Sequence, residues 1–305
     1  MNGTKQPYDL PEDAVWFITG CSSGIGRALA EHVVSQNQRL VATARQISAL
    51  SYLPNNSPNV LKLSLDVSSP TSIDAAVATA LSRFHRLDVV VNNAGYAIYG
   101  DTENASLDTA HKLMETNFWG TVGLTTHAMR IMREQRPQGG VVMNVTSQGG
   151  RTAYQGHAFY HASKFAVEGF TESVSKEVLP KWNIHFCLIE PGGVKTGYVD
   201  KGMVMIPNHP AYGDDSPTRV LERYIKDPEM SKSWADAGKV AETMWEVVNE
   251  GGDIPLRVPL GPDAWAGLMA ENEQQRKELE AGKERAIKVG NAGQAESIAF
   301  LINQK

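Results

Sequence analysis

The sequence predicts an α/β protein of the Rossmann type, a doubly wound parallel sheet of about seven strands with helices on both faces. Short apolar runs alternate with longer stretches of helical periodicity along most of the chain, which is the pattern of repeated βαβ units. The apolar runs are hydrophobic on both faces, as expected for strands covered by helices on both sides. The length of 305 residues suits one large domain of this kind.

Each element is predicted from its own periodicity. The strands are continuous apolar runs rich in Val, Ile and Leu, expected at 14–18, 40–44, 60–65, 87–91, 140–145, 184–189 and 255–259. The helices show apolar residues at helical spacing, expected at about 25–34, 72–83, 107–134, 158–179 and 237–249. We therefore predict a single domain over 1–305 with a core at about 14–260.

Two segments fall outside this alternation. Residues 196–235 hold Gly, Pro, Met and aromatic residues without clear periodicity, and we interpret them as a lid over a substrate site. A surface segment that simply packs onto the domain is the alternative. The apolar and aromatic residues of the segment are Tyr198, Met203, Val204, Met205, Ile206 and Tyr212. The polar stretch 262–305 is predicted to be a helical C-terminal extension with a solvated, charged face.

Composition excludes several classes of function. The net charge is −5 and there is no basic run, which argues against nucleic-acid binding. No apolar stretch approaches the ~20 residues of a membrane span, and the polar N-terminus does not resemble a signal peptide. Cys21 and Cys187 belong to no Cys/His cluster, so we predict no metal site, buried thiols and a cytoplasmic location.

A glycine-rich turn joins the first predicted strand to the first helix. Glycines let a pyrophosphate approach the backbone, and the helix N-terminus offers N–H groups and a positive dipole end. This placement predicts a dinucleotide site, with a purely structural turn as the alternative. The candidate cofactor-binding residues here are Gly20, Ser22, Ser23, Gly24, Ile25 and Gly26.

Arg45 follows the second strand, where a doubly wound fold faces the adenosine ribose. An acidic residue there would bond the 2′-hydroxyl, whereas a basic residue suits a 2′-phosphate. The strand ends Thr43-Ala44-Arg45 without an acid. The sequence therefore favours NADP(H) over NAD(H), and a solvated arginine is the alternative.

Tyr160 and Lys164 are four residues apart on a predicted helix, and Ser147 lies upstream of them. Residues at this spacing share one helix face, so the ammonium can lie beside the phenol and lower its pKa. A tyrosine tuned in this way can act as a general acid or base. A half-buried tyrosine beside a solvated lysine is the alternative for this pair taken alone.

Taken together, the motifs make the chain resemble a short-chain dehydrogenase/reductase of the ordinary single-domain type, over roughly residues 14–260. The matching motifs are Thr19-Gly20-x-x-x-Gly24-x-Gly26, Asp66-Val67, Asn92-Asn93-Ala94-Gly95, Asn117, Ser147, Tyr160-x-x-x-Lys164 and Pro191-Gly192-x-Val194-x-Thr196. The resemblance implies that the catalytic residues are Asn117, Ser147, Tyr160 and Lys164.

The resemblance also implies roles in cofactor binding. Asp66 and Val67 are expected at the adenine, with Tyr160 and Lys164 near the nicotinamide ribose. Asn93, Ala94 and Gly95 are expected to support the adenine ribose region and the sheet. Asn117 is expected to hold a water molecule of a proton relay. The segment expected at the nicotinamide contains Pro191, Gly192, Val194 and Thr196. His157 and His161 are interpreted as substrate-pocket or packing residues.

The function implied is that of an NADP(H)-dependent oxidoreductase, a ketoreductase or alcohol dehydrogenase. The apolar lid residues suggest a bulky apolar carbonyl compound or secondary alcohol as the small-molecule substrate. Two alternatives remain: the same fold used for isomerisation or cyclisation, and a cofactor-binding regulatory protein. The sequence leaves open whether the protein is a homo-oligomer, such as a dimer or tetramer.

Overall fold

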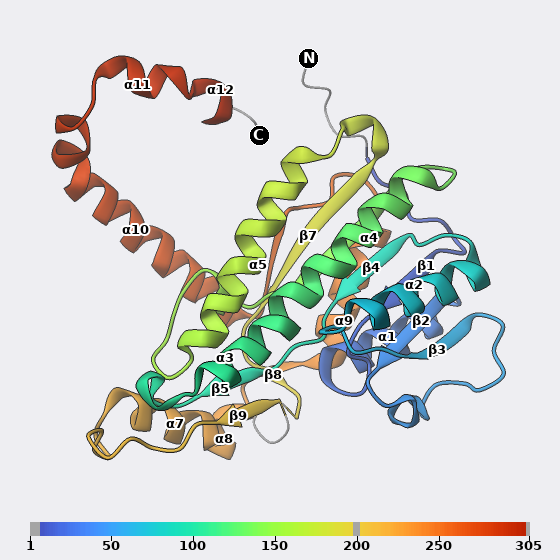
Figure 1. Ribbon diagram of the computed structural model, residues 1–305, viewed down its shortest axis with the longest axis horizontal. Helices are drawn as coiled ribbons and strands as arrows, with labels where there is room; N and C mark the ends of the chain where they lie inside the picture. Colours follow the sequence, from blue (N-terminus) through green and yellow to red (C-terminus); the bar gives the residue numbers. More distant parts are fainter. Residues whose placement is uncertain (1–6, 198–201, 303–305) are drawn as a thin grey trace. The chain divides into compact units, whose positions relative to one another are not determined.

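The computed structural model describes residues 7–197 and 202–302, and its main feature is a seven-stranded parallel sheet (Figure 1). The strand order is β11-β7-β6-β4-β1-β2-β3. The strands are β1 (Val15–Ile18), β2 (Arg39–Ala44), β3 (Val60–Ser64), β4 (Val89–Asn92), β6 (Gly140–Val145), β7 (Ile184–Pro191) and β11 (Arg257–Leu260). This sheet confirms the predicted fold class.

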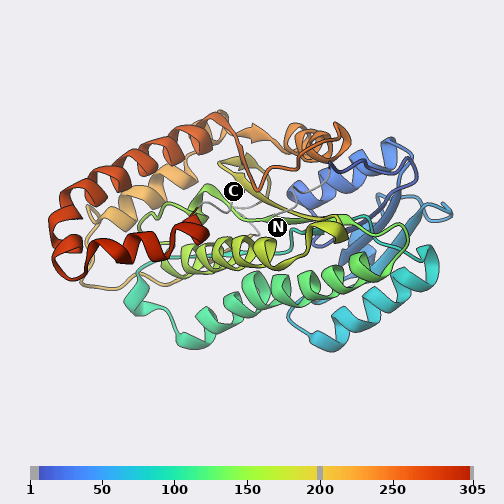
Figure 2. The ribbon, with the colours of Figure 1, turned by 90° about the horizontal axis from the view of Figure 1, so that it is seen from above.

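Helices cover both faces of the sheet (Figure 2). Apolar residues of α1 (Gly24–Ser35) and α9 (Ala237–Asn249) pack with one face of the strands, around Trp16 and Ile18. The other face packs against α2 (Pro70–Phe84), α4 (Gly120–Glu134) and α5 (Ala158–Glu177). All residues of β1, β4, β6 and β7 are buried. Most of them are apolar, and the buried polar side chains among them are Asn92, Asn144, His185 and Glu190.

Several helix starts are explained by local sequence. Ser69 caps α2 by accepting a hydrogen bond from the Ser72 N–H, and Pro70 occupies the first turn. Asp236 caps α9 in the same way through the N–H groups of Gly238 and Lys239. The short helical turns elsewhere are η1 (Ile47–Leu50), η2 (Thr102–Asn104), η4 (Gln148–Gly150) and η5 (Pro180–Trp182).

The strand order reverses between β1 and β4, which lie side by side in the middle of the sheet. Ligands of open α/β sheets bind at the carboxyl ends of the strands beside such a reversal. The glycine-rich turn follows β1 and the Asn93–Gly95 stretch follows β4. The fold therefore brings two of the predicted cofactor motifs together.

The predicted helix at 107–134 differs from the structure in one respect. It consists of α3 (Leu107–Met114), a π-helical turn at Glu115–Trp119, and α4. Such turns insert a residue into an α-helix and are frequent at functional sites. Asn117 lies within this turn.

Residues 196–235 contain regular elements that their composition did not indicate. Within and beside this segment lie β8 (Val194–Lys195), β9 (Met203–Met205), α7 (Pro217–Lys226), α8 (Pro228–Ser231) and β10 (Ala235–Asp236). β9 pairs with β5 (Ala97–Tyr99), and β10 pairs with β8. Tyr198 lies outside the described residues.

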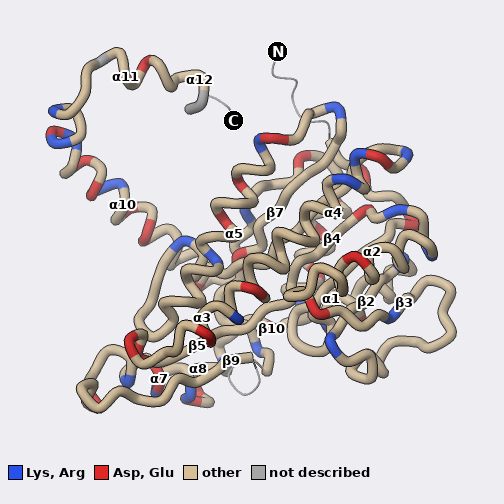
Figure 3. Tube along the Cα trace, viewed as in Figure 1, with Lys and Arg blue, Asp and Glu red and all other residues tan. Residues whose placement is uncertain are grey.

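The C-terminal stretch is helical, with α10 (Pro262–Lys288), α11 (Ala292–Ser297) and α12 (Ala299–Ile302). The chain divides into two compact units, Met1–Trp265 and Ala266–Lys305. Charges of both signs alternate along α10 (Figure 3), where Glu273 pairs with Arg276 at 3.0 Å. Among the described residues no helix combines the length and apolar character that crossing a bilayer requires.

Candidate active site

Tyr160 and Lys164 lie one turn apart on α5, as the sequence predicts. Lys164 Nζ lies 5.8 Å from the centre of the Tyr160 ring, and it donates a hydrogen bond of 2.9 Å to the backbone oxygen of Val145. The lysine is buried, with 7% exposed. Burial lowers the pKa of Lys164 to about 8, and the negative charge of Glu168 partly opposes that shift.

Ser147 faces this pair from the loop after β6. Its extended backbone starts η4, and its Oγ accepts a hydrogen bond of 3.0 Å from the Gly149 N–H. Burial raises the pKa of Tyr160, whereas a hydrogen bond with Ser147 lowers it. The sequence predicted a lowered pKa through Lys164, and this direction was wrong because desolvation of the phenol outweighs the favourable contacts.

Asn117 is held by the loop that follows β4. Its side-chain oxygen accepts from the Tyr96 N–H at 3.0 Å, and its amide group donates to Tyr96 O at 2.9 Å and to Ser163 Oγ at 3.0 Å. Asn117 therefore links the π-helical turn to α5 within one hydrogen-bonded network. A Cβ atom added at Gly95 would lie 3.1 Å from Asn117 Oδ1 and 3.7 Å from Lys164 Nζ, so glycine is suited to this packed corner.

The glycine-rich turn packs too closely for side chains. Gly20 has φ +71°, and a Cβ there would lie 2.9 Å from the Cα atom of Ala94. A Cβ added at Gly26 would lie 2.5 Å from Gly20 O. Gly24 has φ +57° and faces Thr196, whose Cγ2 would be 3.2 Å from an added Cβ. The structure thus places the glycine-rich turn beside Thr196, which was predicted to lie at the nicotinamide.

The N-terminus of α1 carries exposed hydroxyl groups. Ser22 and Ser23 are exposed, and the Ser23 side chain makes no capping hydrogen bond to the helix. Ile25 is partly buried against the core beneath the turn. Free N–H groups, hydroxyls and the positive end of the helix dipole form a cradle that fits a phosphate. Arg45 is exposed at the carboxyl end of β2, on the neighbouring strand.

Asn93 and Ala94 brace this turn. Thr19 Oγ1 accepts hydrogen bonds of 2.9 Å from both backbone N–H groups, and the Asn93 amide donates to Thr19 O at 2.9 Å. Neighbouring Asn92 extends the network inward, since it donates to Asn144 Oδ1 at 2.8 Å. The Asn-Asn-Ala-Gly stretch therefore ties β4 to β1 and β6, in agreement with the predicted support of the sheet.

Asp66 and Val67 follow β3. Asp66 is exposed, and its Oδ1 accepts from the backbone and the hydroxyl of Ser68 at 3.0 and 2.7 Å. Val67 is buried against Gly120 of α4, where an added Cβ would lie 2.8 Å from Val67 O. The two residues follow the edge strand β3, which pairs with β2.

The segment after β7 is held from both sides. The Gly193 N–H donates to Asp263 Oδ2 at 2.7 Å, and Gly193 O accepts from the Ala235 N–H at 2.8 Å. A Cβ at Gly192 would lie 2.2 Å from the same Asp263 oxygen, so only glycine fits there. Pro191 and Val194 are buried, and Thr196 is partly exposed.

His161 was not predicted to support the site. Its Nδ1 lies 2.8 Å from Gly149 O and its Nε2 accepts the Tyr154 N–H at 3.0 Å, so the ring spans the loop that carries Ser147. Burial lowers the pKa of His161, and burial lowers that of His157 to about 4, so both rings are neutral at pH 7. The only available sequence signal was the position of His161 directly after Tyr160.

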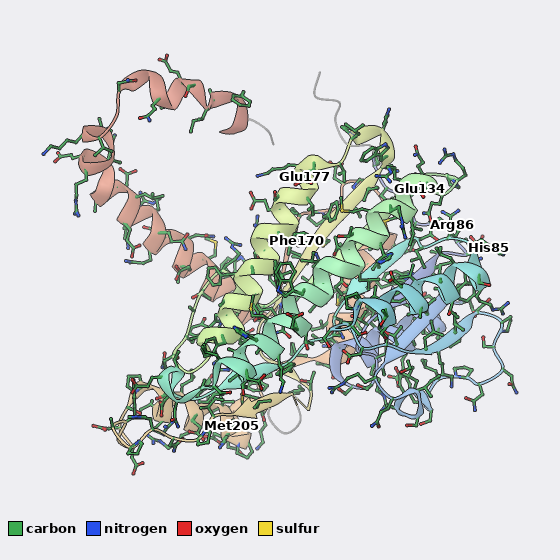
Figure 4. All side chains as sticks on the ribbon, in the orientation of Figure 1. His85, Arg86, Glu134, Phe170, Glu177 and Met205 are labelled. Carbon is green, nitrogen blue, oxygen red and sulfur yellow. The ribbon has the colours of Figure 1, made fainter. Side chains whose placement is uncertain are left out.

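Apolar side chains lie beside Tyr160. Ile98, Leu113 and Ile206 form a buried cluster, and Tyr160 packs against it. Ile206 belongs to the predicted lid, and its N–H donates to Tyr99 O at 2.7 Å. Among the other lid residues, Met203 is partly buried and Val204, Met205 and Tyr212 are exposed; Met205 is labelled in Figure 4.

Comparison with known proteins agrees with this geometry. Residues 14–203 match the short chain dehydrogenase family. The chain belongs to the short-chain dehydrogenase/reductase family. It is 45% identical to the oxidoreductase calM of Penicillium decumbens over 285 residues, which cover 92% of this chain and 94% of the relative. It is 32% identical to retinol dehydrogenase 8 of Bos taurus, with 76% and 75% covered.

Solved structures of short-chain dehydrogenases share the fold. The enzyme from Streptomyces avermitilis superposes with a TM-score of 0.81 at 31% identity, over 91% of this chain and 98% of that chain. A short-chain dehydrogenase/reductase from Burkholderia phymatum in complex with NAD has a TM-score of 0.74 at 22% identity, over 89% and 96% of the two chains. This family of oxidoreductases uses nicotinamide cofactors, and the cradle described above fits such a group.

Proposed function

We propose that the protein is an NADP(H)-dependent oxidoreductase that interconverts a carbonyl group and a secondary alcohol on a bulky apolar substrate. The observation that carries the proposal is the convergence of Ser147, Tyr160 and Lys164 beside the glycine-rich turn. A regulatory cofactor-binding protein would not require a proton donor, a second hydroxyl and a buried ammonium at one place. The two buried thiols, Cys21 and Cys187, fit a cytoplasmic protein.

The side chains perform the acid–base part of the reaction. The Ser147 and Tyr160 hydroxyls donate hydrogen bonds to the substrate oxygen as negative charge develops on it. Tyr160 then transfers its proton to that oxygen in the reduction direction, and accepts it in the oxidation direction. Lys164 would stabilise the resulting phenolate, and Asn117, which bonds Ser163 next to Lys164 on α5, would hold the water molecule that returns the proton. The nicotinamide supplies or accepts the hydride when it is bound.

The cofactor would be held by the groups already described. The pyrophosphate would lie at the α1 N-terminus, near Ser22 and Ser23, and the adenosine at Asp66 and Val67. Arg45 would face the 2′-phosphate. Val194 and Thr196 would contact the carboxamide of the nicotinamide.

Replacing Arg45 by alanine should reduce the preference for NADP(H). One charged contact to a phosphate contributes ~1.5–3 kcal/mol, so the ratio of kcat/KM for NADPH to that for NADH should fall roughly tenfold or more. The measurement is initial rates with both cofactors. Arg133→Ala, at the exposed end of α4, is the matched control. Equal use of both cofactors by the wild-type protein would contradict NADP(H) preference.

The substrate class follows from the apolar surroundings of Tyr160. Ile98, Leu113 and Ile206 offer no polar side-chain group to a substrate, whereas the exposed Val204 and Met205 provide adaptable apolar surface nearby. Retinol dehydrogenase 8, a relative at 32% identity, has a name that indicates a long apolar alcohol. The proposal is tested by measuring NADPH oxidation with a series of carbonyl compounds whose apolar groups increase in size. Isomerisation and cyclisation consume no NADPH, so the same measurement separates them from redox activity.

We propose that residues 196–235 act as a lid over this substrate. Asp101, on the core side, binds the segment through Arg219 and accepts from Thr218 Oγ1 at 2.8 Å. Arg219 and Asp101 are buried, so this contact fixes α7. Most residues between β9 and α7 are exposed, and this stretch is tied to the core where the His209 N–H donates to Asp101 Oδ2 at 2.9 Å. Closure would exclude water and strengthen the hydrogen bonds to the developing oxyanion.

Hydrogen exchange should show the lid directly. Without ligand, amides of the segment outside β9 and α7 should exchange faster than those of the buried strand β6, because exposed backbone opens more easily. NADPH together with a substrate should slow their exchange more than that of the sheet strands. A segment already slow in the free protein and unaffected by ligand would be a fixed structural element and not a lid.

A further inference from the structure

A group of charged side chains lies directly behind the loop that carries Ser147, and the chemistry above does not use it. Glu168 on α5 and Glu190 on β7 are buried, with 5% and 0% exposed. Arg257 of β11 lies against both: its Nε donates to Glu168 Oε2 at 3.0 Å and is 3.7 Å from Glu190 Oε1. Two buried carboxylates that face one guanidinium nitrogen repel each other, which favours the protonation of one of them.

Glu190 is the member of the pair with the weaker contacts. Neither of its carboxylate oxygens has a hydrogen-bond partner among the described residues, although Arg151 Nη1 lies 3.5 Å from Oε1. Burial of an ionised carboxylate with incomplete pairing is unfavourable. Accordingly, burial and the charge of Glu168 raise the pKa of Glu190 to about 7. Glu190 therefore gains and loses its proton within the pH range of ordinary assays.

The two carboxylates touch opposite ends of the Ser147 loop, defined here as residues 146–152. At one end, Thr146 Oγ1 donates to Glu168 Oε1 at 2.7 Å. At the other end, Arg151 faces Glu190. The middle of the loop is held independently by His161 through Gly149 O. A change of charge on the pair therefore changes the attraction on the loop ends that flank Ser147.

The charges around the pair come from several elements. Lys164 lies one turn before Glu168, and Glu172 one turn after it. Glu172 binds Lys176 and Arg257, which lower its pKa to about 2, so it stays ionised. The titratable and charged groups that face Glu190 are Cys187 on β7, Arg151 after η4, Glu168 on α5, and Arg257 on β11.

We propose that Glu190 is a positioning residue that sets the place of Ser147 through Arg151 and the Ser147 loop. The proposal rests on the proposed function, because Ser147 must act on the substrate oxygen. When Glu190 loses its proton, its negative charge attracts Arg151 more strongly and holds the loop. When Glu190 is protonated, the attraction weakens and Ser147 is held less firmly.

Glu190→Gln keeps the size of the side chain and imitates the protonated acid at every pH. At pH 6 the kcat of the variant should be within about twofold of the wild-type value. At pH 8 it should be roughly tenfold lower than wild type, because the variant lacks the charge-assisted contact with Arg151. The KM for the cofactor should not change. Since the titration of Tyr160 affects both proteins alike, the ratio of the two rates isolates the effect of Glu190.

Two further variants make the result specific. Glu172→Gln removes a carboxylate from the same cluster that does not titrate in this range, so any loss of rate should be the same at pH 6 and pH 8. Arg151→Gln removes the partly exposed partner of Glu190 and leaves both buried carboxylates in place. It should show the same pH-dependent loss of kcat, even if Glu190→Gln folds poorly. A ratio of rates that does not vary with pH in both Glu190→Gln and Arg151→Gln would overturn the positioning role.

Thermal unfolding tests the protonation of Glu190 without any measurement of activity. Because the pKa of Glu190 is raised above its unfolded value, the folded wild type binds the proton more tightly and loses stability as pH rises from about 4.5 to about 7. The Tm of Glu190→Gln minus that of wild type should therefore be larger at pH 8 than at pH 5, and an equal difference would overturn the raised pKa of Glu190. A wild type without redox turnover would overturn the proposed function instead.

Discussion

Tyr160→Phe should lower kcat by at least ~10²-fold, the usual contribution of a positioned general acid. The substitution removes only the phenolic oxygen, so the ring keeps its packing against Ile98, Leu113 and Ile206. The binding of NADPH should stay nearly intact, because the phosphate cradle lies on α1 and not on α5. Stopped-flow or steady-state rates, together with a fluorescence titration of the cofactor, separate these two effects.

The matched control is Tyr8→Phe. Tyr8 is also buried, with 4% exposed, but its hydroxyl donates to Asp88 O at 3.4 Å near the amino end of β4, away from Ser147 and Lys164. Its loss should leave turnover unchanged. If Tyr160→Phe keeps most of its rate while binding the cofactor normally, Tyr160 is not the acid, and the isomerase and regulatory alternatives become the better explanations.

The fold could be predicted from the sequence because its strands are apolar on both faces. Trp16, Val90 and Val142 come from different strands, and all are fully buried. A strand in the middle of a covered parallel sheet has no polar face, so the alternation of such runs with amphipathic helices identifies the architecture. The observed ends of β7 and β11 differ from the predicted ones by one or two residues. Pro191 and Pro259 lie in these strands and keep the register although proline has no N–H group.

The arrangement of the cofactor motifs was also accessible, since each one follows a strand. The carboxyl ends of β1 and β4 are neighbours in the sheet, and this places Gly20 beside Ala94. The π-helical turn at Asn117 was not predictable from periodicity, because one inserted residue shifts the apolar pattern only slightly. In the structure, the Asn117 side chain of this turn bonds the backbone of Tyr96.

The electrostatics of the site were the least predictable part. The sequence places Lys164 near Tyr160 but does not reveal how far water is excluded, and exclusion of water raises the pKa of the tyrosine. The environment of Glu190 was also not predictable, because in the sequence this residue simply marks the end of an apolar strand. Only the packing of α5 and β11 over this position shows that Glu168 and Arg257 surround it.

Gly26→Ala should weaken cofactor binding although the backbone of this residue permits alanine. The added Cβ would lie 2.4 Å from Asn93 Nδ2 and 2.5 Å from Gly20 O, so the turn and the Asn93 amide must both move. Overpacking of this kind costs about 1–3 kcal/mol of stability. The displaced Gly20 backbone should raise the Kd for NADPH roughly tenfold or more, equivalent to at least ~1.4 kcal/mol.

Gly169→Ala is the control that separates close packing from a general effect of glycine replacement. Gly169 lies on the exposed side of α5, and an added Cβ meets nothing within 4 Å. Alanine there should leave the Kd unchanged and stabilise the helix by up to ~1 kcal/mol. Urea unfolding and a fluorescence titration of both variants give the comparison. Since Gly26 touches no substrate, a normal Kd in Gly26→Ala would show that the turn is only a structural connection, and the site for the dinucleotide would have to be sought elsewhere on the sheet.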